Sequence, residues 1–75
     1  MRMTYRNYVD AVGRLIVKGM WFSDAIEVAL TVNGMSNISD RMRDRLYGEQ
    51  FIEDVYVFTE GAPGRRTIPK YSPLF

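Results

Sequence analysis

The basic residues near the C-terminus have the types and spacing that bind phosphate. Arg65, Arg66 and Lys70 are the three basic residues between Gly61 and Phe75, and this stretch contains no acidic residue. Adjacent arginines suit phosphate groups or a narrow minor groove of DNA, and a glycine lets the backbone approach a surface closely. We therefore expect these three side chains to contact a DNA backbone. The alternative is a soluble hairpin tip whose charges protect it from edge aggregation.

A second group of polar residues precedes them, in a segment predicted to be a helix with Ile38, Met42 and Leu46 on its buried side. Arginines there could read base edges, and an aspartate can accept a hydrogen bond from cytosine. The competing interpretation is a solvated face on which the acids and arginines pair, Asp40 with Arg43 and Arg41 with Asp44. The candidate DNA-contacting residues of this segment are Ser36, Asn37, Ser39, Asp40, Arg41, Arg43 and Asp44.

The chain lacks the residue types on which most catalytic and metal sites depend. It contains no Cys and no His, so disulfides, thiolate zinc sites and imidazole ligands are excluded. The acids have no visible partner nucleophile or base, and the Gly61–Gly64 turn lacks the lysine and helix of a phosphate-binding loop. We expect no enzyme activity, no metal site and no cofactor. Magnesium bound by carboxylates alone stays open, with no pattern in its favour.

The spacing of apolar residues predicts three helices that would position these side chains. Apolar residues recur at i, i+3, i+4 and i+7, which places them on one helix face. Thr4 and Ser23 are suitable N-caps, and Gly19 suits a left-handed residue after the first helix. The predicted helices cover residues 4–18, 23–31 and 36–48.

The apolar faces of these helices define a predicted core. Trp21 is the single tryptophan, and its place in the link between the first two helices suits a buried side chain. The core residues that we expect to be mostly buried are Val12, Leu15, Ile16, Ile26, Leu30, Ile38, Met42 and Leu46.

The segment after the third helix is predicted to be a β-hairpin. Residues 51–59 alternate loosely and are rich in aromatic and β-branched side chains, which favours a strand. A turn at residues 60–64 would return the chain so that residues 65–71 pair with them, with Pro69 at an edge. Met20–Phe22 is long enough to add a short third strand.

Length and composition indicate one small domain, residues 1–75, with a short tail at 72–75. A hydrophobic content of 47% is too high for intrinsic disorder, but a chain of 75 residues has a thin core, so we expect it to form a homodimer. No apolar run is long enough to span a membrane, and the charged N-terminus is unlike a signal peptide, which predicts a cytoplasmic protein. A net charge of +1 is weak for a nucleic-acid binder.

The span from Tyr5 to Tyr71 resembles the winged helix-turn-helix superfamily, in particular the small regulators of bacteria and their phages. Ser23–Leu30 matches the first helix of the turn motif, Asn33–Gly34 the turn, and Ser36–Leu46 the recognition helix. Leu46 followed by the apolar pair Phe51-Ile52 matches the entry into the wing, although Gln50 stands where the family usually has glycine.

This resemblance implies an α+β fold, a winged helix with a three-helix bundle and a C-terminal hairpin wing. It also implies double-stranded DNA binding, with one helix in the major groove and the wing on the backbone, in a small transcriptional regulator of a bacterial or phage-infected cell. The alternative is a winged helix that binds protein, such as a phage-encoded inhibitor or adaptor acting on a host protein. The near-zero net charge and the Asp40 and Asp44 face favour that alternative. The operator and the direction of regulation stay open.

Overall fold

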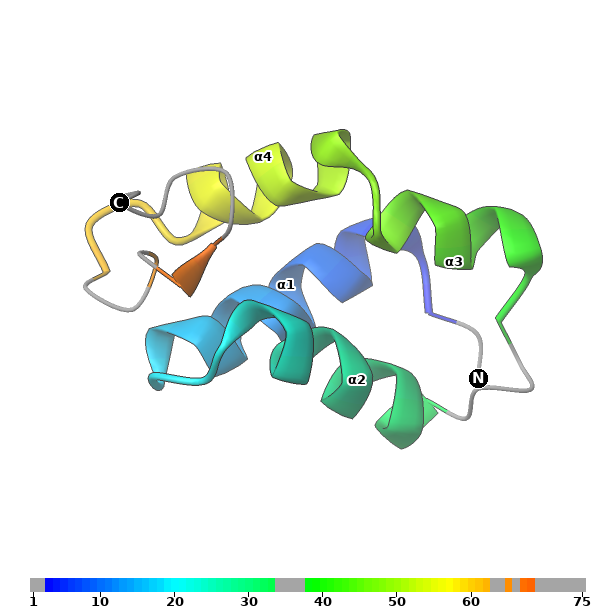
Figure 1. Cartoon of the computed structure of the whole chain (residues 1–75), viewed down its shortest axis with the longest axis horizontal. Helices are drawn as coiled ribbons and strands as arrows, with labels where there is room; N and C mark the ends of the chain where they lie inside the picture. Colours follow the sequence, from blue (N-terminus) through cyan, green and yellow to red (C-terminus); the bar gives the residue numbers. More distant parts are fainter. Residues whose placement is uncertain (1–2, 34–37, 63–64, 66, 69–75) are drawn as a thin grey trace.

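The chain folds as four helices over the part that the structure describes. The structure is a computed structural model, and it describes residues 3–33, 38–62, 65, 67 and 68. Within these residues there is no β-strand (Figure 1). The helices are α1 (Tyr5–Val17), α2 (Phe22–Asn33), α3 (Asp40–Leu46) and α4 (Glu49–Phe58).

The predicted hairpin wing is wrong, because its first strand is the helix α4. Phe51 and Val55 are buried and Ile52 and Tyr56 are partly buried, so the apolar residues recur at i, i+1, i+4 and i+5. This spacing is helical. The same short run also places apolar residues on both faces of a strand, so its pattern alone does not distinguish a covered strand from a core helix. The α+β winged-helix class is therefore also wrong, and residues 65–71 have no strand in 51–59 to pair with.

The first helix begins and ends where its capping residues predict. The Thr4 hydroxyl accepts a hydrogen bond from the Asn7 amide at 3.2 Å, and the Asn7 side chain accepts one from the Thr4 amide. Gly19 has a φ of +103°, the left-handed conformation expected after a helix C-terminus. The predicted helix at 4–18 is confirmed with its caps.

The other helix boundaries differ from the predictions. The Ala25 amide bonds the Trp21 carbonyl at 2.9 Å, so α2 begins at Phe22, and neither the cap at Ser23 nor a strand at Met20–Phe22 is present. Ser39 caps α3 by accepting a hydrogen bond from the Met42 amide at 3.1 Å. The third helix is therefore shorter than the predicted 36–48, whose first two residues lie outside the described ranges.

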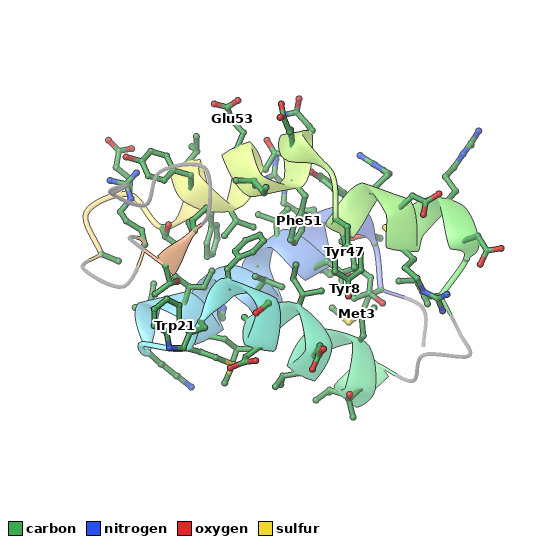
Figure 2. The ribbon with its side chains drawn as sticks, viewed as in Figure 1. Met3, Tyr8, Trp21, Tyr47, Phe51 and Glu53 are labelled. Carbon is green, nitrogen blue, oxygen red and sulfur yellow. The ribbon has the colours of Figure 1, made fainter. Side chains whose placement is uncertain are left out.

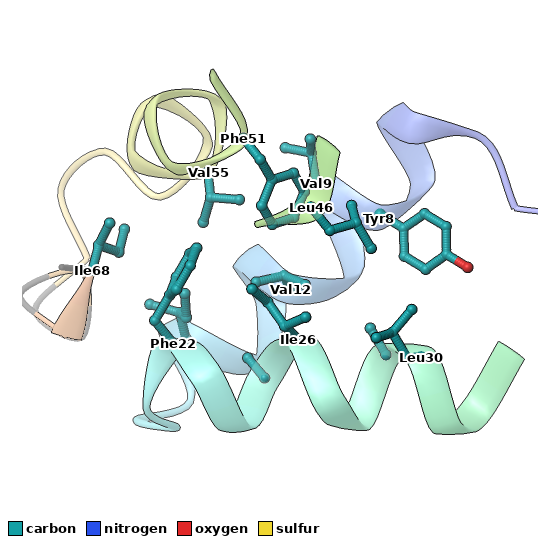
Figure 3. Packing of buried hydrophobic residues seen from close by; sticks show 13 residues of the cluster. Tyr8, Val9, Val12, Phe22, Ile26, Leu30, Leu46, Phe51, Val55 and Ile68 are labelled. Atoms are coloured by element: carbon teal, nitrogen blue, oxygen red, sulfur yellow. The ribbon is translucent and has the colours of Figure 1, made fainter. Parts of the chain in front are cut away.

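The core lies where α1 packs between α2 and α4, with α3 against α4 (Figure 1). Of the eight predicted core residues, Leu15, Ile38 and Met42 are partly buried and the other five are buried. Figure 3 shows the buried set converging from all four helices and from Ile68. It comprises Tyr8, Val9, Val12, Ile16, Phe22, Ala25, Ile26, Ala29, Leu30, Leu46, Phe51, Val55 and Ile68.

Phe51 joins three helices within this core. Its ring meets Tyr5 of α1 edge to face, with centroids 5.8 Å apart, and lies 6.2 Å from the ring of Phe22 of α2. Aromatic pairs in such geometries contribute beyond the area that they bury. The residue predicted to open a strand is thus an anchor of the bundle.

Gly13 sets how closely α1 and α4 approach near their C-terminal ends. A Cβ atom at this position would lie 2.3 Å from Cδ2 of Phe58, far inside van der Waals contact. Glycine in a helix interior costs about 1 kcal/mol relative to alanine. The close approach of Phe58 is therefore a packing reason for a residue that disfavours the helix.

We predict that the change in unfolding free energy caused by Gly13→Ala depends strongly on the side chain at position 58. The substitution should be less favourable by about 1–3 kcal/mol in the wild-type chain than in a Phe58→Ala background, because only the ring obstructs the new methyl group. Urea unfolding of the four chains, followed by circular dichroism, measures this difference. Equal effects in both backgrounds would show that the two helices do not meet at Gly13.

Candidate functional site

Arg65, the first of the three C-terminal residues predicted to contact DNA, contacts other residues of the protein. The Arg65 guanidinium lies 3.7 Å from the centroid of the Tyr56 ring and donates a hydrogen bond to the Tyr56 carbonyl at 3.0 Å. That carbonyl belongs to the last turn of α4, where the helix dipole favours a cation. Arg65 therefore stabilises the end of α4. Arg66 and Lys70, predicted with it, lie outside the described residues.

The structure places the predicted residues of α3 on an exposed, mixed-charge surface. Ser39 is the N-cap, and Arg43 lies 4.0 Å from Asp40, which confirms one of the two pairings proposed for a solvated face. Arg41 and Asp44 are exposed. Such exposed pairs contribute little stability, but they reduce the charge available to a polyanion. Ser36 and Asn37 lie outside the described residues.

The arrangement of α2 and α3 differs from that of a helix-turn-helix. In that motif two helices pack on each other across a turn of three to four residues. Here residues 34–39 connect α2 and α3, and the main packing partner of α3 is α4. The guanidinium of Arg45, an exposed residue of α3, lies 3.8 Å from the Tyr5 ring centroid of α1. The short helix α3 is thus attached to α1 and α4.

Tyr5 lies at the centre of a polar cluster that joins the start of α1 to α4. Its hydroxyl donates a hydrogen bond to Oδ2 of Asp54 at 2.5 Å, and Gln50 donates to Oδ1 of the same carboxylate at 3.0 Å. Burial, the hydrogen bond to Asp54 and the negative charge of Asp54 raise the pKa of Tyr5 to about 12. The raised pKa keeps the Tyr5 hydroxyl protonated near neutral pH, so it acts as a hydrogen-bond donor that joins the start of α1 to α4.

An apolar stripe on α2 is the largest departure from the predicted burial. Trp21 is 66% exposed, Val32 is 81% exposed and Val28 is 37% exposed. These residues are spaced at i, i+7 and i+11, so they lie within about 40° of one another around the helix. Figure 2 shows Trp21 beside the turn that leads from α1 into α2. We define Trp21, Val28 and Val32 as the α2 stripe.

The sequence predicted a buried Trp21, and this prediction is wrong. Trp21 immediately precedes α2. Its side chain lies to one side of the face of α2 that is buried in the core. The helical spacing of Trp21, Val28 and Val32 was visible in the sequence. It gave no warning of exposure, because a second apolar face on the same helix fits burial against another element equally well.

The acidic residues of α2 border this stripe along one side. Asp24 and Glu27 are both exposed, and the segment Phe22–Asn33 contains no basic residue. Viewed down the helix axis, Asp24 lies about 40° from Val28, and Glu27 lies about 60° beyond Asp24 in the same direction. Ala25 borders the other side and is buried. The α2 stripe therefore has one acidic edge and one edge that continues into the core.

A smaller apolar surface lies at the C-terminal ends of α1 and α4. Val17 and Phe58 line a shallow hollow of about 240 Å³ together with Arg14 and Lys18. Pockets for small molecules usually measure at least about 300 Å³, and this one is open. Arg14 already forms an ion pair with Asp10. The hollow is too small and too open to hold a typical small-molecule ligand.

Two kinds of site are not seen in the part of the chain that the structure describes. No group of three His, Cys, Asp or Glu side chains there is arranged to hold a metal ion. None of the helices in these residues is both long enough and apolar enough to cross a bilayer.

Comparison of this chain with protein-family models, with curated proteins and with solved structures finds no match. Its function must therefore be inferred from its own surfaces. The α2 stripe is the candidate functional site.

The Tyr5 cluster predicts a specific loss of stability in alkaline solution. The folded-state pKa of Tyr5, about 12, lies above the ordinary value of 10.0, so the folded chain holds this proton more tightly than the unfolded chain. This contribution is complete below pH 10.0 and is lost as the pH rises through about 12. Thermal unfolding of the wild type and Tyr5→Phe across this range measures it. The wild type should lose more stability than the variant; parallel curves would show that Tyr5 does not bond Asp54.

Proposed function

We propose that this chain is a small helical module that binds another protein through the α2 stripe. The observation that carries this proposal is an indole side chain 66% exposed and a valine 81% exposed along the same side of one helix. Exposed apolar groups that gather on one surface mark interaction sites more often than scattered ones do. Tryptophan is also enriched among the residues that dominate binding energy at protein interfaces. The protein-binding alternative of the sequence analysis thus receives the better support, without its winged fold.

The charges of the molecule support the same choice. The chain has 10 basic and 9 acidic residues, and two of its arginines, Arg45 and Arg65, stack on tyrosine rings. DNA affinity depends on cations that neutralise phosphates. A protein interface needs no such excess, because aromatic and apolar contacts supply most of its affinity. We place this module in the cytoplasm of a bacterial or phage-infected cell, without enzyme activity of its own.

Substituting Trp21 and Val32 of the α2 stripe should weaken binding of the partner while leaving the fold intact. We expect Trp21→Ser/Val32→Ser to weaken retention of the partner from an extract of the native cell at least about 10-fold, since central interface residues commonly contribute 2 kcal/mol or more. Affinity capture of the tagged full chain with quantitative mass spectrometry measures this. Val57→Ser is the matched control, because Val57 is also an exposed valine, at 62%, but lies on α4. A protein retained equally by all three chains would contradict the proposal.

DNA binding by α3 is the second candidate, and the exposure of Arg41 on this helix favours it. If α3 contacts phosphates, random duplex DNA should shift in a gel at low salt, and Arg41→Ala should reduce the salt slope by about one unit. Glu60→Ala, which removes an exposed acid after α4, is the control. Binding that the arginine substitution weakens and the α2 substitutions leave unchanged would replace our first proposal with this one.

A further inference from the structure

Resting on the proposed function, we infer that the segment bound by the α2 stripe is an amphipathic helix with basic residues along one side. Three features of this surface point to such a partner: the length of the stripe, the position of its acidic edge and the absence of basic residues in α2. Each of these properties selects a feature of the partner.

The length of the stripe fits a short helix. Trp21 and Val32 are eleven positions apart, which corresponds to about 16 Å along the helix axis. A helix of three turns that presents apolar residues at i, i+3 or i+4, i+7 and i+11 covers this distance. An isolated apolar side chain would contact only one end of the stripe.

The acidic edge selects the charge of the partner. Asp24 and Glu27 lie on the same side of Val28, both are exposed, and no basic residue of α2 neutralises them. The nearest basic residue that precedes the stripe in sequence, Lys18, lies beyond its N-terminal end. A helix seated on the stripe therefore meets two negative charges along one border. Lysine or arginine at that border complements them, whereas glutamate or aspartate is repelled.

The same charges argue against a second copy of this chain at this surface. A two-fold axis that pairs α2 with an antiparallel α2 brings the two acidic edges to the same side of the interface, acid against acid. A two-fold parallel pair separates these edges but gives neither of them a basic partner from α2. A different protein with a basic helix satisfies the acids in either direction.

Trp21 provides a direct test, because it is the only tryptophan in the chain. The probes are two synthetic helical peptides of about four turns with the same leucine face, one carrying lysine and one carrying glutamate at the polar positions. The lysine peptide should shift the Trp21 emission to shorter wavelength at physiological salt. The glutamate peptide should need at least about 10-fold higher concentration for the same change.

Charge reversal on α2 should exchange this preference. Asp24→Lys/Glu27→Lys should weaken the lysine peptide roughly 3- to 10-fold and strengthen the glutamate peptide, since each exposed pair contributes a modest amount. Glu49→Lys/Glu60→Lys alters two exposed acids on and just after α4 and should leave both affinities unchanged. Circular dichroism of each variant confirms that it is folded.

The outcomes separate this inference from the function on which it rests. If both peptides bind equally, or charge reversal has no effect, the basic partner is wrong while the α2 stripe remains an interaction site. If neither peptide changes the Trp21 emission and partner capture does not depend on Trp21 and Val32, the proposed function fails as well. If sedimentation shows a dimer that Val32→Ser dissociates, the occupant is a second copy and the inference is overturned.

Discussion

The packing of α1 against α4 is the constraint on which the rest of the structure depends. It is fixed at two points: Tyr5 at the start of α1 bonds Asp54 in the middle of α4, and Gly13 of α1 admits the ring of Phe58, the last residue of α4. A helix pair aligned in this way leaves α1 one further face, which α2 covers. Phe51 then meets both Tyr5 and Phe22, so the position of α4 also determines how α2 is seated.

This arrangement uses side chains that would otherwise define a nucleic-acid surface. Arg45 covers the Tyr5 ring, and Arg65 covers the Tyr56 ring while bonding the last turn of α4. Each guanidinium stacks on an aromatic face and lies near the C-terminal end of a helix, α3 for Arg45 and α4 for Arg65. These two arginines therefore contribute to the stability of the fold.

The helix α2 has the opposite character. It gives the core five side chains, Phe22, Ala25, Ile26, Ala29 and Leu30, while Val28 and Val32 on this helix and Trp21 just before it are exposed. A domain of this size has too little interior to bury every apolar side chain of a short helix. The exposed stripe and its acidic border are consequently available for association, and they make α2 the natural place to look for a partner.

The sequence by itself determined the features that depend on local chemistry. The cap Thr4, the left-handed Gly19, the helical face of α1 and the burial of Ile26, Leu30 and Leu46 follow from hydrogen-bonding capacity, glycine geometry and a period of 3.6 residues. Only the tertiary structure decided that residues 49–58 are a helix, because a short segment with apolar residues on two faces suits a covered strand and a core helix alike. The same ambiguity hid the candidate site. Spacing places Trp21, Val28 and Val32 on one face of α2, but whether another element covers that face depends on where α1 and α4 lie, which no local pattern specifies.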